Sequence, residues 1–271
     1  MERGICKLCL LEKDLVESHL VPKAVYPYCR AGDLDPVMIR HDVILPTQRQ
    51  IYWHLLCEEC EDVLNKGGES WVVPLLAEQM GKYPLFDLLD LRALHASDRE
   101  LSVYHAAKIP AIKTDKLVHL AMGIFFKASV HSFQKTVSKP MIDLGQIQSP
   151  IRQFLRRAGP FPPDTVLMLS LTPSPVKYAC FTVPIQTKNE YAKQYFFYLP
   201  GLRFTLVTGP RTREAKMVCL HATPEKIIFV EDLSQEIKKW FELGSKGARR
   251  TKKFFEYADA VKEIKRLGRS R

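Results

Sequence analysis

The 271-residue sequence lacks long hydrophobic runs and the motifs of several large enzyme classes. Its most apolar uncharged stretch, residues 117–126, is about half the roughly 20 residues that a membrane-spanning helix needs. The N-terminal residues contain no apolar segment typical of a secretion signal. There is no Walker-type phosphate loop, GxGxxG turn or GxSxG elbow, which argues against a nucleotide-driven motor, a dinucleotide-binding dehydrogenase and an α/β-hydrolase. We therefore expect a cytoplasmic protein without a membrane partner.

Hydrophobic residues make up 46% of the chain and charged residues 26%, which is the balance of a folded protein with a substantial core. A chain of this length can form one large domain or a small module joined to a larger one. Changes in the residue pattern favour three parts, and the sequence contains neither internal repeats nor low-complexity tracts. We place the three parts at residues 1–70, 71–160 and 161–271, within an α+β fold.

Hydrophobic periodicity predicts a different structure for each part. Residues 1–70 have too few apolar residues at helix or strand spacing to form a core, so we expect a metal ion to organise them. Residues 71–160 have helical spacing and include a buried central helix, predicted over 114–138. In residues 164–230 the period falls to two and turn residues recur, which predicts an antiparallel meander of five or six strands. Two terminal helices follow the meander.

The net charge of +10 comes from 40 Lys and Arg against 30 Asp and Glu, and it is concentrated at one end. Residues 236–271 carry 12 basic and five acidic side chains, whereas residues 1–66 carry eight basic and 11 acidic ones. A basic segment of this kind attracts a polyanion such as nucleic acid. A solvated helix face with mixed charges is the alternative interpretation. The residues that we predict to contact phosphates are Arg249, Arg250, Lys252 and Lys253.

Four of the seven cysteines form two CxxC pairs, Cys6 with Cys9 and Cys57 with Cys60, separated by 47 residues. Two such pairs are the typical ligands of a tetrahedral structural zinc ion. Four thiolates would close the coordination sphere, so this zinc would stabilise the fold without taking part in catalysis. A chance occurrence of both pairs is the alternative.

The segments around these cysteines resemble a known family. Residues 17–22 read ESHLVP, and residues 55–62 read LLCEECED. A CxxC pair, then SHxxP, then LLCxxCE at the start of a helix, is similar to the zinc-stabilised branch of the HNH endonucleases, including bacterial HNH-like proteins. In that branch a treble-clef, ββα-metal unit carries the active site. The resemblance implies a metal-dependent endonuclease that hydrolyses phosphodiester bonds in nucleic acid, with DNA favoured over RNA.

The resemblance also assigns catalytic roles. His19 matches the general base that activates water, a role suited to a side chain with a pKa near neutral. Glu61 and Asn65 lie four residues apart, on one face of a helix, where the family holds its catalytic metal. Their oxygens suit Mg²⁺ or Mn²⁺. Ser18 stands where many relatives have a metal ligand, and we expect it to bind a phosphate oxygen or to orient His19.

Each assignment has a structural alternative. His19 could pack within the zinc module, and Ser18 could begin a turn. Glu61 could complement the helix dipole, and Asn65 could cap the helix before Gly67.

Further departures from the family pattern leave a second function open. Tyr52 replaces an Asn that braces the catalytic loop, and His41 and His54 are candidates for a missing ligand. Glu69 would join the site only if the helix continued through two glycines. The alternative function is a zinc-scaffolded subunit that binds nucleic acid or protein without catalysis, for example in a bacterial defence complex. A protein partner or a homo-oligomer is compatible with either function.

Overall fold

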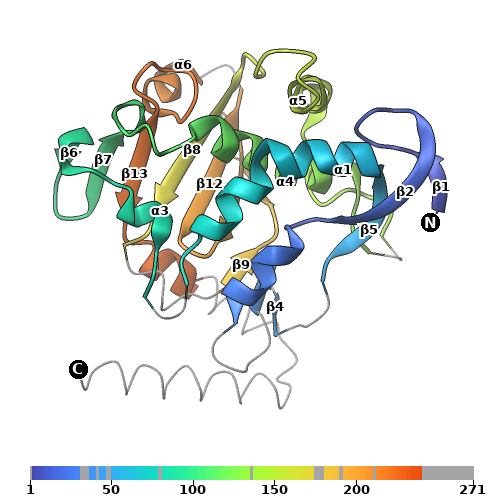
Figure 1. Cartoon of the computed structure of the whole chain (residues 1–271), viewed down its shortest axis with the longest axis horizontal. Helices are drawn as coiled ribbons and strands as arrows, with labels where there is room; N and C mark the ends of the chain where they lie inside the picture. Colours follow the sequence, from blue (N-terminus) through green and yellow to red (C-terminus); the bar gives the residue numbers. More distant parts are fainter. Residues whose placement is uncertain are drawn as a thin grey trace.

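The computed structural model describes most of the chain up to residue 239 (Figure 1). The described residues are 2–30, 37–40, 43–46, 50–78, 81–134, 137–173, 180–188, 192–209 and 212–239. They form a mixed α+β fold, as the sequence predicts. His41, the second terminal helix and the predicted phosphate contacts Arg249, Arg250, Lys252 and Lys253 lie outside these residues.

The strands form one seven-stranded and two three-stranded sheets. Their bounds are β1 Glu2–Ile5, β2 Glu12–His19, β3 Val37–Arg40, β4 Val43–Pro46, β5 Tyr52–Cys57, β6 Leu94–Ser97, β7 Leu101–His105, β8 Thr165–Leu171, β9 Cys180–Thr182, β10 Ile185–Lys188, β11 Lys193–Leu199, β12 Leu202–Thr208 and β13 Ile227–Glu231.

The helices are short except for one. The α-helices are α1 Glu58–Leu64, α2 Ser70–Val72, α3 Pro84–Asp87, α4 Thr114–Val130, α5 Gln148–Leu155 and α6 Thr212–Ala215. A π-helix, η2 Asn65–Glu69, joins α1 to α2. The 3-10 helices are η1 Lys23–Cys29, η3 Val73–Leu75, η4 Leu91–Ala93, η5 Ala106–Lys108, η6 Gly145–Ile147 and η8 Lys216–Val218. Residues 234–239 are also helical.

The N-terminal part is built on a three-stranded sheet in the order β1-β2-β5. β2 and β5 are antiparallel, with Leu15 opposite Cys57 and His19 opposite Tyr52. Because α1 begins directly after β5, these elements form a strand–strand–helix unit. The chain between the two strands contributes β3, which pairs with β4 and, in parallel, with β9 from the C-terminal part.

The large sheet has the order β10-β11-β12-β8-β13-β7-β6. β10, β11, β12 and β8 are antiparallel neighbours, but β13 lies parallel to β8. The predicted antiparallel meander therefore holds only for β10, β11 and β12. β8 pairs with β12, and β9 belongs to another sheet. β13 is parallel to β8 because the chain after β12 passes through α6 and η8 and returns on the other side of β8. Within the segment predicted to be a meander, residues 215–222 form no strand: they contain the end of α6, then η8, and then irregular chain.

The middle part is less helical than its hydrophobic spacing predicts. β6 and β7 form a hairpin there and add two strands to the large sheet. The Asp90 carboxylate accepts a hydrogen bond from the backbone N–H of Arg92 at 2.8 Å and starts a 3-10 turn. The Asp98 carboxylate accepts from the N–H groups of Glu100 and Leu101, which fixes the hairpin turn. These side-chain bonds stop the predicted helix and start a hairpin.

The predicted central helix is confirmed as α4, which ends at Val130 and is buried at 14 of its 17 residues. It lies between the large sheet and the N-terminal unit (Figure 1). On the sheet side, the ring of Phe125 contacts that of Phe197 on β11, with centroids 4.9 Å apart. On the other side, α4 contacts α1, η2 and α2.

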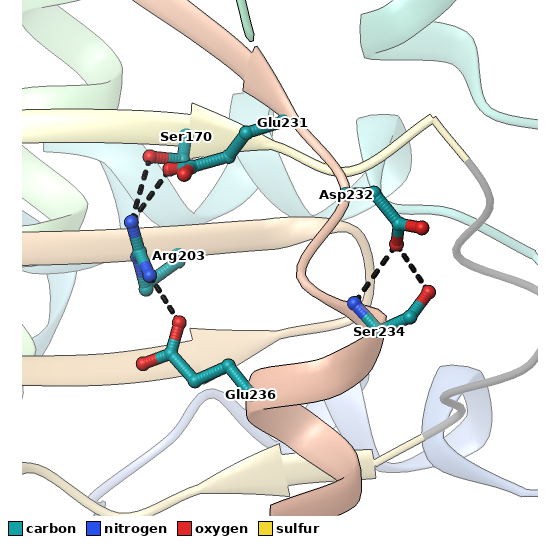
Figure 2. Close-up of polar contacts among 6 residues, drawn as sticks. All are labelled: Ser170, Arg203, Glu231, Asp232, Ser234 and Glu236. Carbon is teal, nitrogen blue, oxygen red and sulfur yellow. Dashed lines mark hydrogen bonds and ion pairs between the residues drawn. The ribbon is translucent and has the colours of Figure 1, made fainter. Parts of the chain in front are cut away.

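The first turn of the terminal helix is fastened to the large sheet by Arg203 (Figure 2). Its guanidinium donates to the carboxylates of Glu231, at 2.6 Å, and Glu236, and to the hydroxyl of Ser170 at 3.3 Å. The interactions therefore tie together β12, β13, β8 and the helix over residues 234–239.

One cluster of buried side chains extends through all three parts and includes Leu56, Leu120 and Phe204. The proposed domain boundaries stay a prediction. Among the described residues, no helix combines the length and the apolar character needed to cross a membrane.

Candidate functional site

Four cysteines meet at one end of the strand–strand–helix unit. Cys6 and Cys9 lie in the turn after β1, Cys57 ends β5, and Cys60 lies in the first turn of α1. Their sulfur atoms all lie within 4.8 Å of one another. The Cys9 and Cys57 sulfurs are 3.9 Å apart, close to the roughly 3.8 Å between two ligands that each lie about 2.3 Å from a tetrahedral zinc. The cluster can therefore hold a metal ion such as zinc.

Backbone hydrogen bonds shape this cluster. The N–H of Cys6 donates to the carbonyl of Leu11, and the N–H of Leu10 donates to the carbonyl of Cys6, each at 2.9 Å. A hydrogen bond from the Cys60 thiol, supported by N–H groups of nearby residues, lowers the pKa of Cys6 to about 4. One of these N–H groups is that of Cys57, at 3.4 Å from the Cys6 sulfur. Cys6 is thus a thiolate at neutral pH, the form that binds metals.

Beside the cysteine cluster is an open pocket of about 750 Å³. Its walls come from β2, η1, α1, η2 and α4. Six acidic side chains and two lysines line it, so the pocket is strongly negative. The lining residues are Val16, Glu17, His19, Pro22, Lys23, Glu58, Glu59, Glu61, Asp62, Asn65, Glu69 and Lys127. Three of the four predicted active-site residues, His19, Glu61 and Asn65, therefore share one cavity.

His19 is held at the end of β2 by two neighbours. The strand has an irregular register between Val16 and Glu17, which lets both line the pocket along with His19. The imidazole Nε2 donates a hydrogen bond to the amide oxygen of Gln50 at 2.7 Å. The ring also contacts that of Tyr52, with centroids 5.5 Å apart. Because Nε2 carries the proton, Nδ1 is the nitrogen that can accept one.

Ser18, the fourth predicted active-site residue, lies between two strands of the N-terminal sheet. It is fully buried and is not among the residues lining the pocket. Its hydroxyl oxygen accepts a hydrogen bond from the N–H of Leu56 at 3.0 Å and thereby links β2 to β5. This arrangement favours an orienting role for Ser18 over direct contact with a phosphate.

Glu61 lies in the first turn of α1, directly after the last cysteine of the cluster. Burial raises the pKa of its carboxyl group, and the Lys127 ammonium and Ser18 hydroxyl oppose that rise. Its buried Oε1 has no hydrogen-bond partner among the described residues. A buried acceptor of this kind is costly unless a ligand satisfies it.

The helix does continue past Asn65, but as the π-helix η2, so Glu69 also reaches the pocket. The two glycines permit the π-helix because any larger residue would clash with α4: a Cβ on Gly67 would lie 2.1 Å from the His119 ring. A Cβ on Gly68 would lie 2.5 Å from the carbonyl oxygen of Lys116 on α4. The glycines therefore allow η2 to pack directly against α4. π-helical turns occur often at functional sites.

Lys127 is a pocket residue that the sequence analysis missed. Its side chain extends from α4 and is 1% exposed, and its ammonium group lies 3.3 Å from the Glu69 Oε1. The signal was available, since Lys127 is a charged residue within the otherwise apolar face of the central helix. Gln50 was missed as well, because nothing in its local sequence marks it as a partner of His19.

The remaining candidate ligand lies elsewhere. His54 is on β5, where its Nδ1 faces the Glu2 carboxylate at 3.5 Å, and it does not line the pocket. Among the described residues, the four cysteines are also the only group of three or more His, Cys, Asp or Glu side chains with ligand atoms close enough to share a metal.

No family model matches the chain, and no significant match was found among curated proteins or solved structures.

Proposed function

We propose that the chain is a metal-dependent HNH-like endonuclease, with a treble-clef, ββα-metal unit formed by β2, β5 and α1. A structural zinc ion bound by the four cysteines would hold the strands to the helix. The proposal rests on one observation: the residues that the family resemblance selects, His19, Glu61 and Asn65, line one open pocket beside the cysteine cluster.

The environment of His19 supports its role as general base. With Nε2 donating to Gln50, Nδ1 is available to take a proton from water. The water oxygen would form a bond to phosphorus, and the bond from phosphorus to the leaving oxygen would break. The leaving oxygen would then take a proton from solvent, which balances the proton held by His19.

The donor set of the pocket fits a hard divalent cation. Glu61 offers a buried carboxylate oxygen without a hydrogen-bond partner, and Asn65 adds an amide oxygen on the same wall. Oxygen donors of this kind suit Mg²⁺ or Mn²⁺. When bound, the cation would neutralise charge on the scissile phosphate and the leaving oxygen.

The test is cleavage of plasmid DNA and of RNA by the purified protein with Mg²⁺ or Mn²⁺, beside a His19→Ala variant. We expect cleavage by the wild type and a loss of at least about 100-fold in the variant, which is the usual contribution of a general base. Equal rates in both proteins would overturn the role of His19. Zinc content and melting temperature should match between the two proteins, which excludes misfolding of the variant.

A binding function without catalysis is the second candidate, and one observation favours it. Among the described residues, no three acidic or His ligand atoms converge in the pocket as the cysteines do in their cluster. Titration with Mn²⁺ separates the candidates. A Mn²⁺-binding site that is present in the wild type and absent from Glu61→Gln supports the nuclease. Nucleic-acid binding with zinc alone and no cleavage supports the binding function.

A further inference from the structure

Lys127 is a nearly completely buried cation whose hydrogen-bonding capacity is mostly unused. Its ammonium group has three donors, but among the described residues it makes one hydrogen bond, to the Glu69 Oε1 at 3.3 Å. Charged N–H···O pairs are normally about 2.7–2.9 Å long. A buried charge with so weak a partner is unfavourable unless another group completes its environment.

An acceptor without a donor lies in the same pocket. The buried Oε1 of Glu61 lacks any donor among the described residues. Lys127 and Glu61 line the same cavity, and the Lys127 charge acts on the Glu61 carboxyl group. The pocket therefore presents a cationic group and an anionic group that are each incompletely hydrogen-bonded, which is complementary to a ligand that carries both charges.

We propose that Lys127 binds a non-bridging oxygen of the substrate phosphate. This inference rests on the proposed function, in which a divalent cation is bound by Glu61. A phosphodiester entering a pocket with six acidic side chains needs cationic contacts, and the lysines of the lining are Lys23 and Lys127. Lys127 is the buried one, so its charge is less screened by water than that of the exposed Lys23.

The proposed contact would act without proton transfer. Negative charge on the phosphate oxygens increases as water attacks, and a fixed ammonium group stabilises that charge. Lys127 is held in place by α4, which is buried at 14 of its 17 residues, so little rearrangement is required. The active site would then combine a base from β2, an acidic wall from α1 and η2, and a cation from the middle part of the chain.

The test compares Lys127→Met with Lys113→Met, which removes the same charge from an exposed position just before the same helix, outside the pocket lining. We expect Lys127→Met to reduce cleavage by about 100-fold, as for loss of one charge-stabilising donor, and Lys113→Met to leave it within about twofold. In the His19→Ala background, binding of a labelled DNA duplex should weaken at least about tenfold on Lys127→Met.

A purely structural role would make Lys127 only the partner of Glu69. The variant Lys127→Met/Glu69→Gln removes both charges and separates the two roles, and it serves equally if the single variant fails to fold. Cleavage and binding by the double variant that remain far below those of Glu69→Gln support the phosphate contact. Recovery to the Glu69→Gln level would overturn it. If His19→Ala abolishes cleavage while Lys127→Met does not, this inference fails and the proposed function stands.

Discussion

Two cations, the partly buried Arg203 in the large sheet and the buried Lys127 in the pocket, show how similar charges can be used differently. Arg203 donates to two carboxylates and a hydroxyl that come from three separate elements (Figure 2). Lys127 has a single, longer bond to Glu69. The Arg203 guanidinium makes three hydrogen bonds within the fold, although its Nε has no partner among the described residues, so its interactions stabilise structure. The Lys127 group is incompletely satisfied beside an open pocket, which is typical of a binding residue.

The same contrast applies to the two ends of the molecule. The large sheet is stabilised by apolar packing between α4 and strands such as β11. The strand–strand–helix unit instead has the cysteine cluster and, beside it, a negative pocket. Variants that affect one end and spare the other can therefore test this division.

Loss of a cysteine ligand should have the largest effect. We expect Cys60→Ser to reduce zinc from about one ion per chain to near zero, because three thiolates no longer close the tetrahedral site. Hydrogen exchange should then become faster in β2 and β5 while β11 and β12 keep most of their protection.

Cys29→Ala is the matched control, since Cys29 is buried but lies outside the cluster. It should retain zinc. Equal loss of protection in both sheets of Cys60→Ser would show that the two ends unfold as one unit, and the division would be wrong.

Removal of the Arg203 charge should reduce stability but spare the pocket. We expect Arg203→Met to lower the free energy of unfolding by about 2–3 kcal/mol, somewhat less than for a fully buried pair because the side chain is 20% exposed. Urea unfolding measures this loss. DNA binding and cleavage, corrected for the folded fraction, should match the wild type. A loss of cleavage as large as that expected for Lys127→Met would remove the distinction between the two cations.

The smallest expected effect is a pH dependence that originates in the large-sheet region. Burial lowers the pKa of His221 to about 4, and its ring lies 3.7 Å from that of Phe161. In the unfolded chain His221 becomes protonated near pH 6.5, whereas in the folded chain it stays neutral down to about pH 4. Its contribution to the free energy of unfolding is therefore present above pH 6.5 and is lost as the pH falls toward 4.

Between pH 6.5 and 5, the free energy of unfolding should fall by roughly 1–2 kcal/mol because of His221. His221→Leu should unfold with a shallower pH dependence over this window, as measured by urea midpoints at several pH values. An identical slope in both proteins would contradict the assignment to His221.

The sequence was sufficient to predict the features that depend on local pattern. The CxxC spacing predicts the cysteine cluster, and helical spacing predicts the central helix. The resemblance selected His19, Glu61 and Asn65, which share the pocket. Strands β8, β11 and β12 lie within residues 164–230, where strands were predicted.

Features that depend on long-range contacts were not predictable in this way. The parallel pairing of β13 with β8 requires a crossover whose direction no local pattern records. Glycines normally weaken a helix, so Gly67 and Gly68 led to the expectation that the helix would end before Glu69. Glycine is needed at both positions because α4, which is about 50 residues later in the sequence, packs directly against them. Lys127 belongs to the pocket for the same reason.

The π-helix also makes the pocket sensitive to chain length. Each residue of a helix turns the following side chains by about 100°. Deletion of Lys66 would therefore convert η2 toward an ordinary α-helical turn and rotate Glu69 away from Lys127, although neither residue is changed. The alignment of the acidic wall with the cation on α4 is thus set by the number of residues in this short segment as much as by their identity.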